Sequence, residues 1–204
     1  MEQIGLFPLG IVLLPHERIP LHIFEDRYKE LIGECLAEQG EFGLVHADES
    51  GMRSVGTRGG VAQVLQRLDD GRMNIVVEGR ERFSIVRLTE GRSFQTAVVE
   101  PVRDEPGTDP QPEQVEACLE AVEEVADLAE TEIPDVDPAD SELSFRIAGR
   151  IDFSADSKQE LVEMTSERER LERLTEMLDD AAETLRLRRL AEERARGNGQ
   201  VEGP

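Results

Sequence analysis

Residue types that commonly build binding and catalytic sites are scarce in this sequence. Its 204 residues include no Trp, one Tyr, three His and two Cys, which are Cys35 and Cys118. Two cysteines cannot form a disulfide-rich scaffold or a cysteine-based zinc site, and they are typical of a reducing compartment. An aromatic cage for a cation, or a stacking platform for bases, would have few rings from which to form. We therefore expect no metal, no cofactor and no readout of RNA by stacking.

Segments apolar enough to cross a membrane are also lacking. No stretch reaches the roughly 20 apolar residues that a bilayer requires. The apolar segment 4–15 is interrupted by Pro8 and Pro15, and no basic residue precedes it. It therefore lacks the form of a secretory signal. We expect a cytoplasmic protein that does not bind membranes.

Positive charge is in short supply, and the negative charge is unevenly distributed. The chain has 45 Asp and Glu against 23 Lys and Arg, a net charge of −22, and only two of the cations are Lys. Residues 104–142 alone carry 15 acidic side chains and no Lys or Arg. Affinity for nucleic acids and for anionic lipids comes largely from cationic side chains. Both are therefore disfavoured as partners.

The acidic stretch also marks a boundary. It begins with the turn-forming run 104–110, DEPGTDP, and the residues before and after it differ in pattern. We predict a β-barrel subdomain at 1–103, an acidic linker at 104–112, a helical subdomain at 113–196 and a disordered tail at 197–204.

Short apolar segments separated by turn residues predict that the first 103 residues form strands around one helix. The helix is expected from Phe24 to Gln39, because apolar residues recur there at helical spacing. The run 69–71, DDG, predicts a hairpin, Gly79 a bend, and the segment 56–60, GTRGG, a turn. The expected strands are 4–14, 19–23, 42–46, 61–68, 72–78, 83–88 and 94–102. Strands of this number and spacing favour a small, closed or half-closed barrel.

Apolar positions three and four residues apart predict helices in the second half. The first should start at Pro112 with an almost purely acidic outer face, and a short helix is expected at 141–151. Capping-box patterns at Ser157 and Ser166, each followed three residues later by Glu, predict helix starts near 158 and 167. The last helix is long and should pack through an apolar seam. The seam consists of Leu171, Leu174, Leu178, Ala181 and Leu185.

The sequence contains no recognisable catalytic motif. His16, His22 and His46 form no pair at the spacing of a metal site and have no neighbouring Cys. It has no nucleophile elbow, no phosphate-binding loop with Gly-Lys-Ser/Thr and no His-Glu-x-x-His. The carboxylates of 104–142 lack the pattern of a calcium loop, so a solvated face is expected. We therefore predict a protein without enzymatic activity.

Several short motifs carry a family resemblance. The segment 20–28, PLHIFEDRY, follows FPLG at 7–10 and LP at 14–15. After it come FGLV at 42–45, VGT at 55–57, DGR at 70–72 and GRERF at 79–83, with weaker matches at 159–164, 170–171 and Leu174. In this order and spacing the chain resembles the N-terminal substrate-binding domain of Lon proteases up to about residue 190. The family usually has Pro where Asp26 stands, and both residues suit a first helical turn.

The resemblance implies an α+β fold, with a PUA-like small β barrel carrying one helix and then a C-terminal α-helical bundle that ends in a long helix. In full-length Lon this domain precedes an ATPase module and a Ser-Lys protease domain, and we expect neither here. The resemblance therefore implies a stand-alone, non-catalytic binding module that holds polypeptide segments passively.

An exposed apolar strip on the barrel, or the groove between barrel and bundle, is the expected place for an extended or partly unfolded polypeptide. The candidate residues lie near strand ends and loops, and each of them could equally belong to the core. They are Leu13, Leu14, Ile19, Leu21 and Met52. The acidic helix at 113–130 favours basic partners over acidic ones. A separate protease is a further candidate partner.

Residues of the resembling motifs are expected to be structural, through an Arg–carboxylate pair that fastens the helix to the barrel. They are Phe24, Glu25, Arg27, Tyr28, Arg82 and Phe83. A polar pocket formed by four of them, Glu25, Arg27, Tyr28 and Arg82, would instead favour a small-molecule sensor or an undetected enzyme. RNA binding is a further alternative that is suggested by the PUA-like fold alone. It would need a basic patch built from Arg53, Arg58, Arg80, Arg82 and Arg87.

Overall fold

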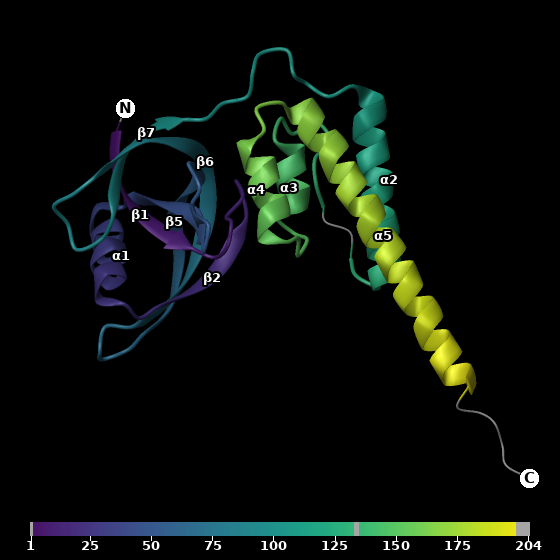
Figure 1. The fold of residues 1–204 in the computed structure, drawn as a ribbon, viewed down its shortest axis with the longest axis horizontal. Helices are drawn as coiled ribbons and strands as arrows, with labels where there is room; N and C mark the ends of the chain where they lie inside the picture. Colours follow the sequence, from purple (N-terminus) through teal and green to yellow (C-terminus); the bar gives the residue numbers. More distant parts are fainter. Residues whose placement is uncertain (1, 133–134, 199–204) are drawn as a thin grey trace, which may run out of the picture. The chain divides into compact units, whose positions relative to one another are not determined.

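The computed structural model describes residues 2–132 and 135–198, and it confirms the mixed α+β class (Figure 1). The chain divides into two compact units. The β unit contains residues 1–106 and 145–165, and the helical unit contains residues 107–144 and 166–204. Residues 145–165, which we expected in the helical half, thus cluster with the strands.

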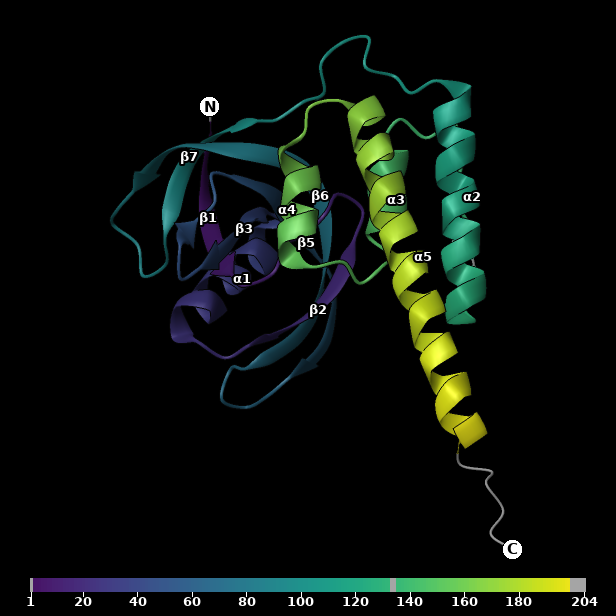
Figure 2. The same ribbon diagram turned by 45° about the vertical axis from the view of Figure 1, so that its right-hand side comes forward.

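A seven-stranded sheet builds the β unit (Figures 1 and 2). Its strands are β1 (Glu2–Leu9), β2 (Arg18–Ile23), β3 (Glu41–Asp48), β4 (Gly51–Met52), β5 (Val55–Arg67), β6 (Met73–Thr89) and β7 (Thr96–Pro101). The strand order is β1-β7-β6-β5-β3-β4, and β1 also pairs in parallel with β3. The sheet therefore closes on itself as the predicted small barrel. Strand β2 lies outside this order and pairs with β6.

Two glycine segments have other roles than those we predicted. Segment 56–60 lies inside β5 and is not a turn, and Gly79 lies inside β6, which continues through it without a break. Glycine is needed at both places because another part of the chain lies too close for a side chain. A Cβ at Gly79 would lie 2.0 Å from the carbonyl oxygen of Leu14, and one at Gly56 would lie 2.4 Å from that of Leu44. Local sequence pattern does not distinguish such close packing from a turn.

The main core of the β unit lies between the strands and helix α1 (Asp26–Glu38). Three aromatic rings meet in it. The ring centroid of Phe7 lies 4.0 Å from that of Tyr28 and 5.8 Å from that of Phe42. Aromatic pairs at such separations stabilise a core beyond the effect of the area that they bury.

Helix α1 ends where the sequence predicted and starts slightly later. It begins at Asp26, the position at which the resembling family usually has Pro, and it ends before Gln39, which has a left-handed φ of 53°. Phe24 was expected on its apolar face. This residue precedes the helix instead, and its side chain is 57% exposed.

Two short helices, α3 (Leu143–Ala148) and α4 (Ala155–Glu163), follow the acidic stretch. The hydroxyl of Ser154 accepts a hydrogen bond from the N–H of Ser157, so α4 starts earlier than the predicted residue 158. Local capping by Ser154 explains the difference.

Polar side chains fix α4 to the sheet of the β unit. The ammonium of Lys158 lies 2.6 Å from the carboxylate of Glu17, and the amide of Gln159 donates to the carbonyl of Val55. Glu17 is itself buried, and its other carboxylate oxygen accepts from the N–H of Leu14 at 2.9 Å. The turn before β2, the start of β5 and α4 are thereby held together.

The helical unit is built from α2 (Pro112–Ala129) and the long α5 (Glu167–Asn198), which pack side by side (Figures 1 and 2). Helix α2 starts at Pro112 as predicted, and α5 starts directly after Ser166, whose hydroxyl accepts from the N–H of Glu169. In the seam, Ala182 is buried in place of the predicted Ala181. Residues 197 and 198 end α5, and the rest of the predicted disordered tail lies outside the described residues.

Candidate functional site

Strand β2 and the adjoining parts of β5 and β6 form a three-stranded extension of the sheet. Residues 18–23 of β2 pair with residues 73–78 of β6, and these pair on their other side with β5. In the part of the chain that the structure describes, β2 has no other strand partner. Its second edge is therefore open, and open strand edges are places where another chain can add.

A groove of about 600 Å³ lies over this extension. Its lining residues are Pro20, Leu21, His22, Leu65, Gln66, Asn74 and Ile75. A polar row crosses it, since Nδ1 of His22 lies 2.6 Å from Oδ1 of Asn74, whose amide donates to Gln66 at 3.1 Å. These bonds hold the side chains of three neighbouring strands in one arrangement.

Large apolar side chains flank the polar row. Leu65 is 53% exposed, and Phe24, which is 57% exposed, stacks on the ring of His22 at 5.8 Å between centroids. We call Pro20, Leu21, His22, Phe24 and Leu65 the β2 surface. Single exposed apolar residues are common, but an exposed leucine that lines the groove and an exposed phenylalanine that stacks on its His22 together indicate a contact surface.

The structure brings only one of the five predicted strip residues, Leu21, to this groove. Leu13 and Leu14 are buried, at 1% and 0% exposure, because the turn that follows them packs on β6 at Gly79. They are therefore no part of an exposed strip. Ile19 is half-buried and packs against the main core, and Met52 packs against a second, smaller core cluster.

The predicted polar pocket of Glu25, Arg27, Tyr28 and Arg82 does not form. Glu25 and Arg27 make a local, exposed ion pair at 2.8 Å, and the guanidinium of Arg27 lies 4.4 Å from the ring centroid of Tyr28. Burial raises the pKa of the Tyr28 hydroxyl. Arg82 instead pairs with Asp104, and Phe83 is fully buried in the smaller core cluster. None of these residues therefore forms the Arg–carboxylate pair that we expected to fasten the helix to the barrel.

Sequence reasoning missed Leu65 and Asn74. Strict alternation from Val61, which packs against the core, would turn residue 65 toward the core as well. The β5–β6 register shifts between Val61 and Gln63, so that Val64 packs against the core and Leu65 is exposed. No residue type in this segment marks the shift.

The basic patch that RNA binding would need is neutralised. Four of its five arginines pair with carboxylates of the β unit, and Arg82 is buried as well. The pairs are Arg53–Asp156, Arg58–Glu2, Arg80–Glu41 and Arg82–Asp104.

Within residues 2–132 and 135–198, no group of three or more His, Cys, Asp or Glu side chains is placed to hold a metal ion. In the same ranges, no helix has the length and apolar character of a membrane span.

Solved structures of Lon N-terminal domains share this fold. The crystal structure of a Lon N-terminal domain protein from Xanthomonas campestris matches with a TM-score of 0.63 at 24% identity, over 85% of this chain and 97% of that one. The N-terminal domain of a Lon protease of the Mycobacterium avium complex matches with a TM-score of 0.68 at 20% identity, over 88% and 99%. The fold is therefore that of a Lon N-terminal domain.

Residues 3–180 match the family model of the ATP-dependent protease La (LON) substrate-binding domain, and the chain belongs to this family. The Lon proteases of Rhizobium meliloti (strain 1021) and Escherichia coli (strain K12) are 28% and 27% identical to it, over 80% and 91% of this chain. The chain spans about a quarter of the length of these relatives, 22% and 26%. The resemblance noted in the sequence is confirmed.

Proposed function

We propose that this protein is a non-catalytic recognition module that binds exposed apolar segments of polypeptides at the β2 surface. The proposal rests on membership of the Lon substrate-binding family and on one observation, that Phe24, stacked on His22 of β2, and Leu65 of the same groove are both exposed. Native proteins keep such side chains buried, whereas unfolded chains expose them. The surface would thus distinguish unfolded from folded partners.

The chemistry of β2 favours weak and reversible binding. Pro20 lies in the middle of this strand and has no N–H, so an added strand would find one donor fewer. A Pro on an edge strand also limits unwanted pairing between copies of a protein. Apolar contacts with Phe24 and Leu65 would supply most of the affinity. We propose that bound segments are released unchanged and become available to a separate protease.

Binding of a permanently unfolded protein, such as reduced and carboxymethylated lactalbumin, tests the proposal. Labelled probe is titrated with the full chain, and its fluorescence anisotropy is followed. The double variant Phe24→Ala/Leu65→Ala should bind roughly tenfold more weakly, a loss of about 1.4 kcal/mol. The matched control is Val86→Ala/Leu88→Ala, which truncates two exposed apolar residues on β6 of the same unit. Equal affinities of the two double variants, or equal affinity for native lactalbumin, would overturn the proposal.

A further inference from the structure

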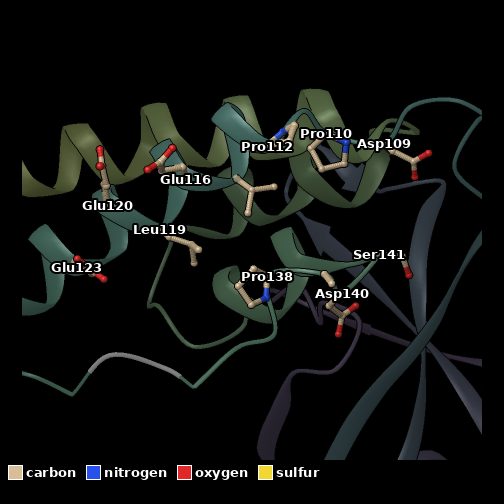
Figure 3. Close-up of a pocket in the computed structure, with 12 residues that line it drawn as sticks. Asp109, Pro110, Pro112, Glu116, Leu119, Glu120, Glu123, Pro138, Asp140 and Ser141 are labelled. Carbon is tan, nitrogen blue, oxygen red and sulfur yellow. The ribbon is translucent and has the colours of Figure 1, made fainter.

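The helical unit contains a second hollow, of about 840 Å³, between α2 and the segment 138–141 (Figure 3). Val115 and Leu119 contribute its apolar floor from α2, and both are only partly buried. Pro110 and Pro112 lie at one side of the hollow, and Pro138 lies across it. We call this hollow the acidic groove, for the reason that follows.

Five carboxylates line the acidic groove, and none of its twelve lining residues is basic. They are Asp109, Glu116, Glu120, Glu123 and Asp140. Among the side chains that the structure describes, no Lys or Arg forms an ion pair with Glu116, Glu120 or Glu123. Glu116, Glu120 and Glu123 recur on α2 at a spacing of four and three, at which like charges repel and destabilise a helix. These three glutamates of the groove therefore lack the cations that their charge would favour.

The other acidic face of α2 is different, because α5 supplies it with arginines. Arg186 pairs with Glu124, and Arg189 pairs with Glu130 at 3.0 Å. Glu124 and Glu130 are thus paired with arginines of α5, whereas Glu116, Glu120 and Glu123 are not. Glu116, Glu120 and Glu123 are therefore available to cations of another molecule.

We infer that the acidic groove binds a short basic segment of a partner polypeptide, one that carries apolar side chains among its Lys or Arg residues. Apolar side chains of the segment would contact Val115 and Leu119, and its cations would lie over Glu116, Glu120 and Glu123. A nucleic acid would be repelled by the rim. A small polyamine would leave the apolar floor uncovered.

Three prolines, Pro110, Pro112 and Pro138, restrict the backbone of the groove walls. Prolines have a fixed φ and lose little freedom when a partner binds. The N-terminus of α2 is closed by a reciprocal pair of hydrogen bonds between Gln111 and Gln114. The inference concerns other residues than the β2 surface, in a different unit, and extends the proposed function without depending on it.

Three labelled peptides of equal length test the inference by fluorescence anisotropy. The first combines Lys and Arg with Leu, the second replaces Leu with Ser, and the third replaces the basic residues with Glu. The first peptide should bind at least several-fold more tightly than the second, lose affinity as salt is added, and be poorly displaced by spermine. The third should not bind. If the first two peptides bind alike, or spermine displaces the first completely, charge alone acts and the inference fails.

Variants locate the site. Glu116→Gln/Glu120→Gln should weaken binding of the first peptide about tenfold or more. The matched control is Asp179→Asn/Glu183→Gln, which removes two exposed charges at the same spacing on α5, outside the groove lining. Removing like charges at this spacing should not destabilise either helix. Equal losses in the two variants would contradict a defined site. Phe24→Ala/Leu65→Ala should bind the first peptide normally, so failure of one proposal is distinguishable from failure of the other.

Discussion

The guanidinium of Arg82 lies 2.5 Å from the carboxylate of Asp104, and the same group donates to the carbonyls of Val162 and Met164. It also lies 5.1 Å from the ring centroid of Phe145. Arg82 is 4% exposed, so these contacts replace the hydrogen bonds that its guanidinium would otherwise make with water. One side chain thereby joins β6, the segment after β7 and the end of α4. The sequence placed Arg82 in a motif that we expected to be structural, and these partners of Arg82 lie outside that motif.

Replacement of Arg82 by Ala should lower the free energy of unfolding by about 1–3 kcal/mol, because it removes the donor that the carbonyls of Val162 and Met164 share and one partner of the half-buried Asp104. Urea unfolding followed by circular dichroism measures the loss. Arg87→Ala on the same strand is the control, since Arg87 is exposed, and should change stability by less than about 0.5 kcal/mol. Equal unfolding midpoints for both variants would contradict the role of Arg82.

The same substitution at two glycines should have opposite effects. Gly79→Ala should destabilise by about 1–3 kcal/mol, because the added methyl group meets the backbone of Leu14. Gly33 lies inside α1 with open space around it, so Gly33→Ala should stabilise by about 0.5–1 kcal/mol. Thermal unfolding of the two variants beside the unmodified chain measures both changes. A stabilised Gly79→Ala variant would show that the turn at Leu14 can move away.

A buried polar network joins the starts of α3 and α5. Glu167 accepts from the hydroxyl and the N–H of Ser144 at 2.7 and 2.8 Å, and it pairs with the fully buried Arg170 at 2.6 Å. Glu167→Leu should cost about 3–5 kcal/mol, since it takes away a carboxylate that pairs with the buried Arg170 and accepts two hydrogen bonds from Ser144. Glu167→Leu/Arg170→Met should be more stable than Glu167→Leu alone. Additive losses in urea unfolding would contradict coupling between the two side chains.

Both thiols should be unreactive in the folded protein. Burial raises the pKa of Cys35 and of Cys118 to about 11, and neighbouring carboxylates, Glu34 in the case of Cys35, act in the same direction. Only about one thiol in a thousand is then ionised near pH 8, and the thiolate is the reactive form. Alkylation followed by mass spectrometry should find both residues unmodified until urea is added. Rapid labelling of the native chain would contradict their burial.

The same shifts predict how stability responds to alkaline pH. The folded thiols hold their protons above the ordinary value of 9.0, whereas those of the unfolded chain lose them. The stability that the protonated thiols contribute is therefore complete below pH 9.0 and is lost as the pH rises through about 11. A Cys35→Ala/Cys118→Ala variant should show a smaller loss over this range, measured by urea unfolding at each pH.

Local sequence patterns predicted the helices and strands of the fold. They could not predict features that depend on contacts between residues far apart in the sequence. Pro112 and Ser166 start their helices where a proline and a hydroxyl are expected to. Gly79 was misinterpreted because its constraint comes from Leu14, which lies far from it in the sequence. Leu65 was missed because a register shift, which leaves no mark in composition, turns it outward. Of the predicted strip residues only Leu21 lines the β2 groove, since burial depends on which loop covers which strand.

The β unit is built from two separate parts of the chain, residues 1–106 and 145–165, and this has a consequence for how the protein is made. Val162 and Met164, which accept hydrogen bonds from Arg82, are synthesised some 80 residues after it. A nascent chain that has emerged only to the end of β7 can pair its strands, but Asp104, Val162 and Met164, which bind Arg82 in the finished fold, are still to come. The barrel can therefore reach its final stability only after residues 145–165 have left the ribosome. Expression of residues 1–103 alone should yield an aggregation-prone fragment, and a soluble β unit needs the later segment supplied in the same chain.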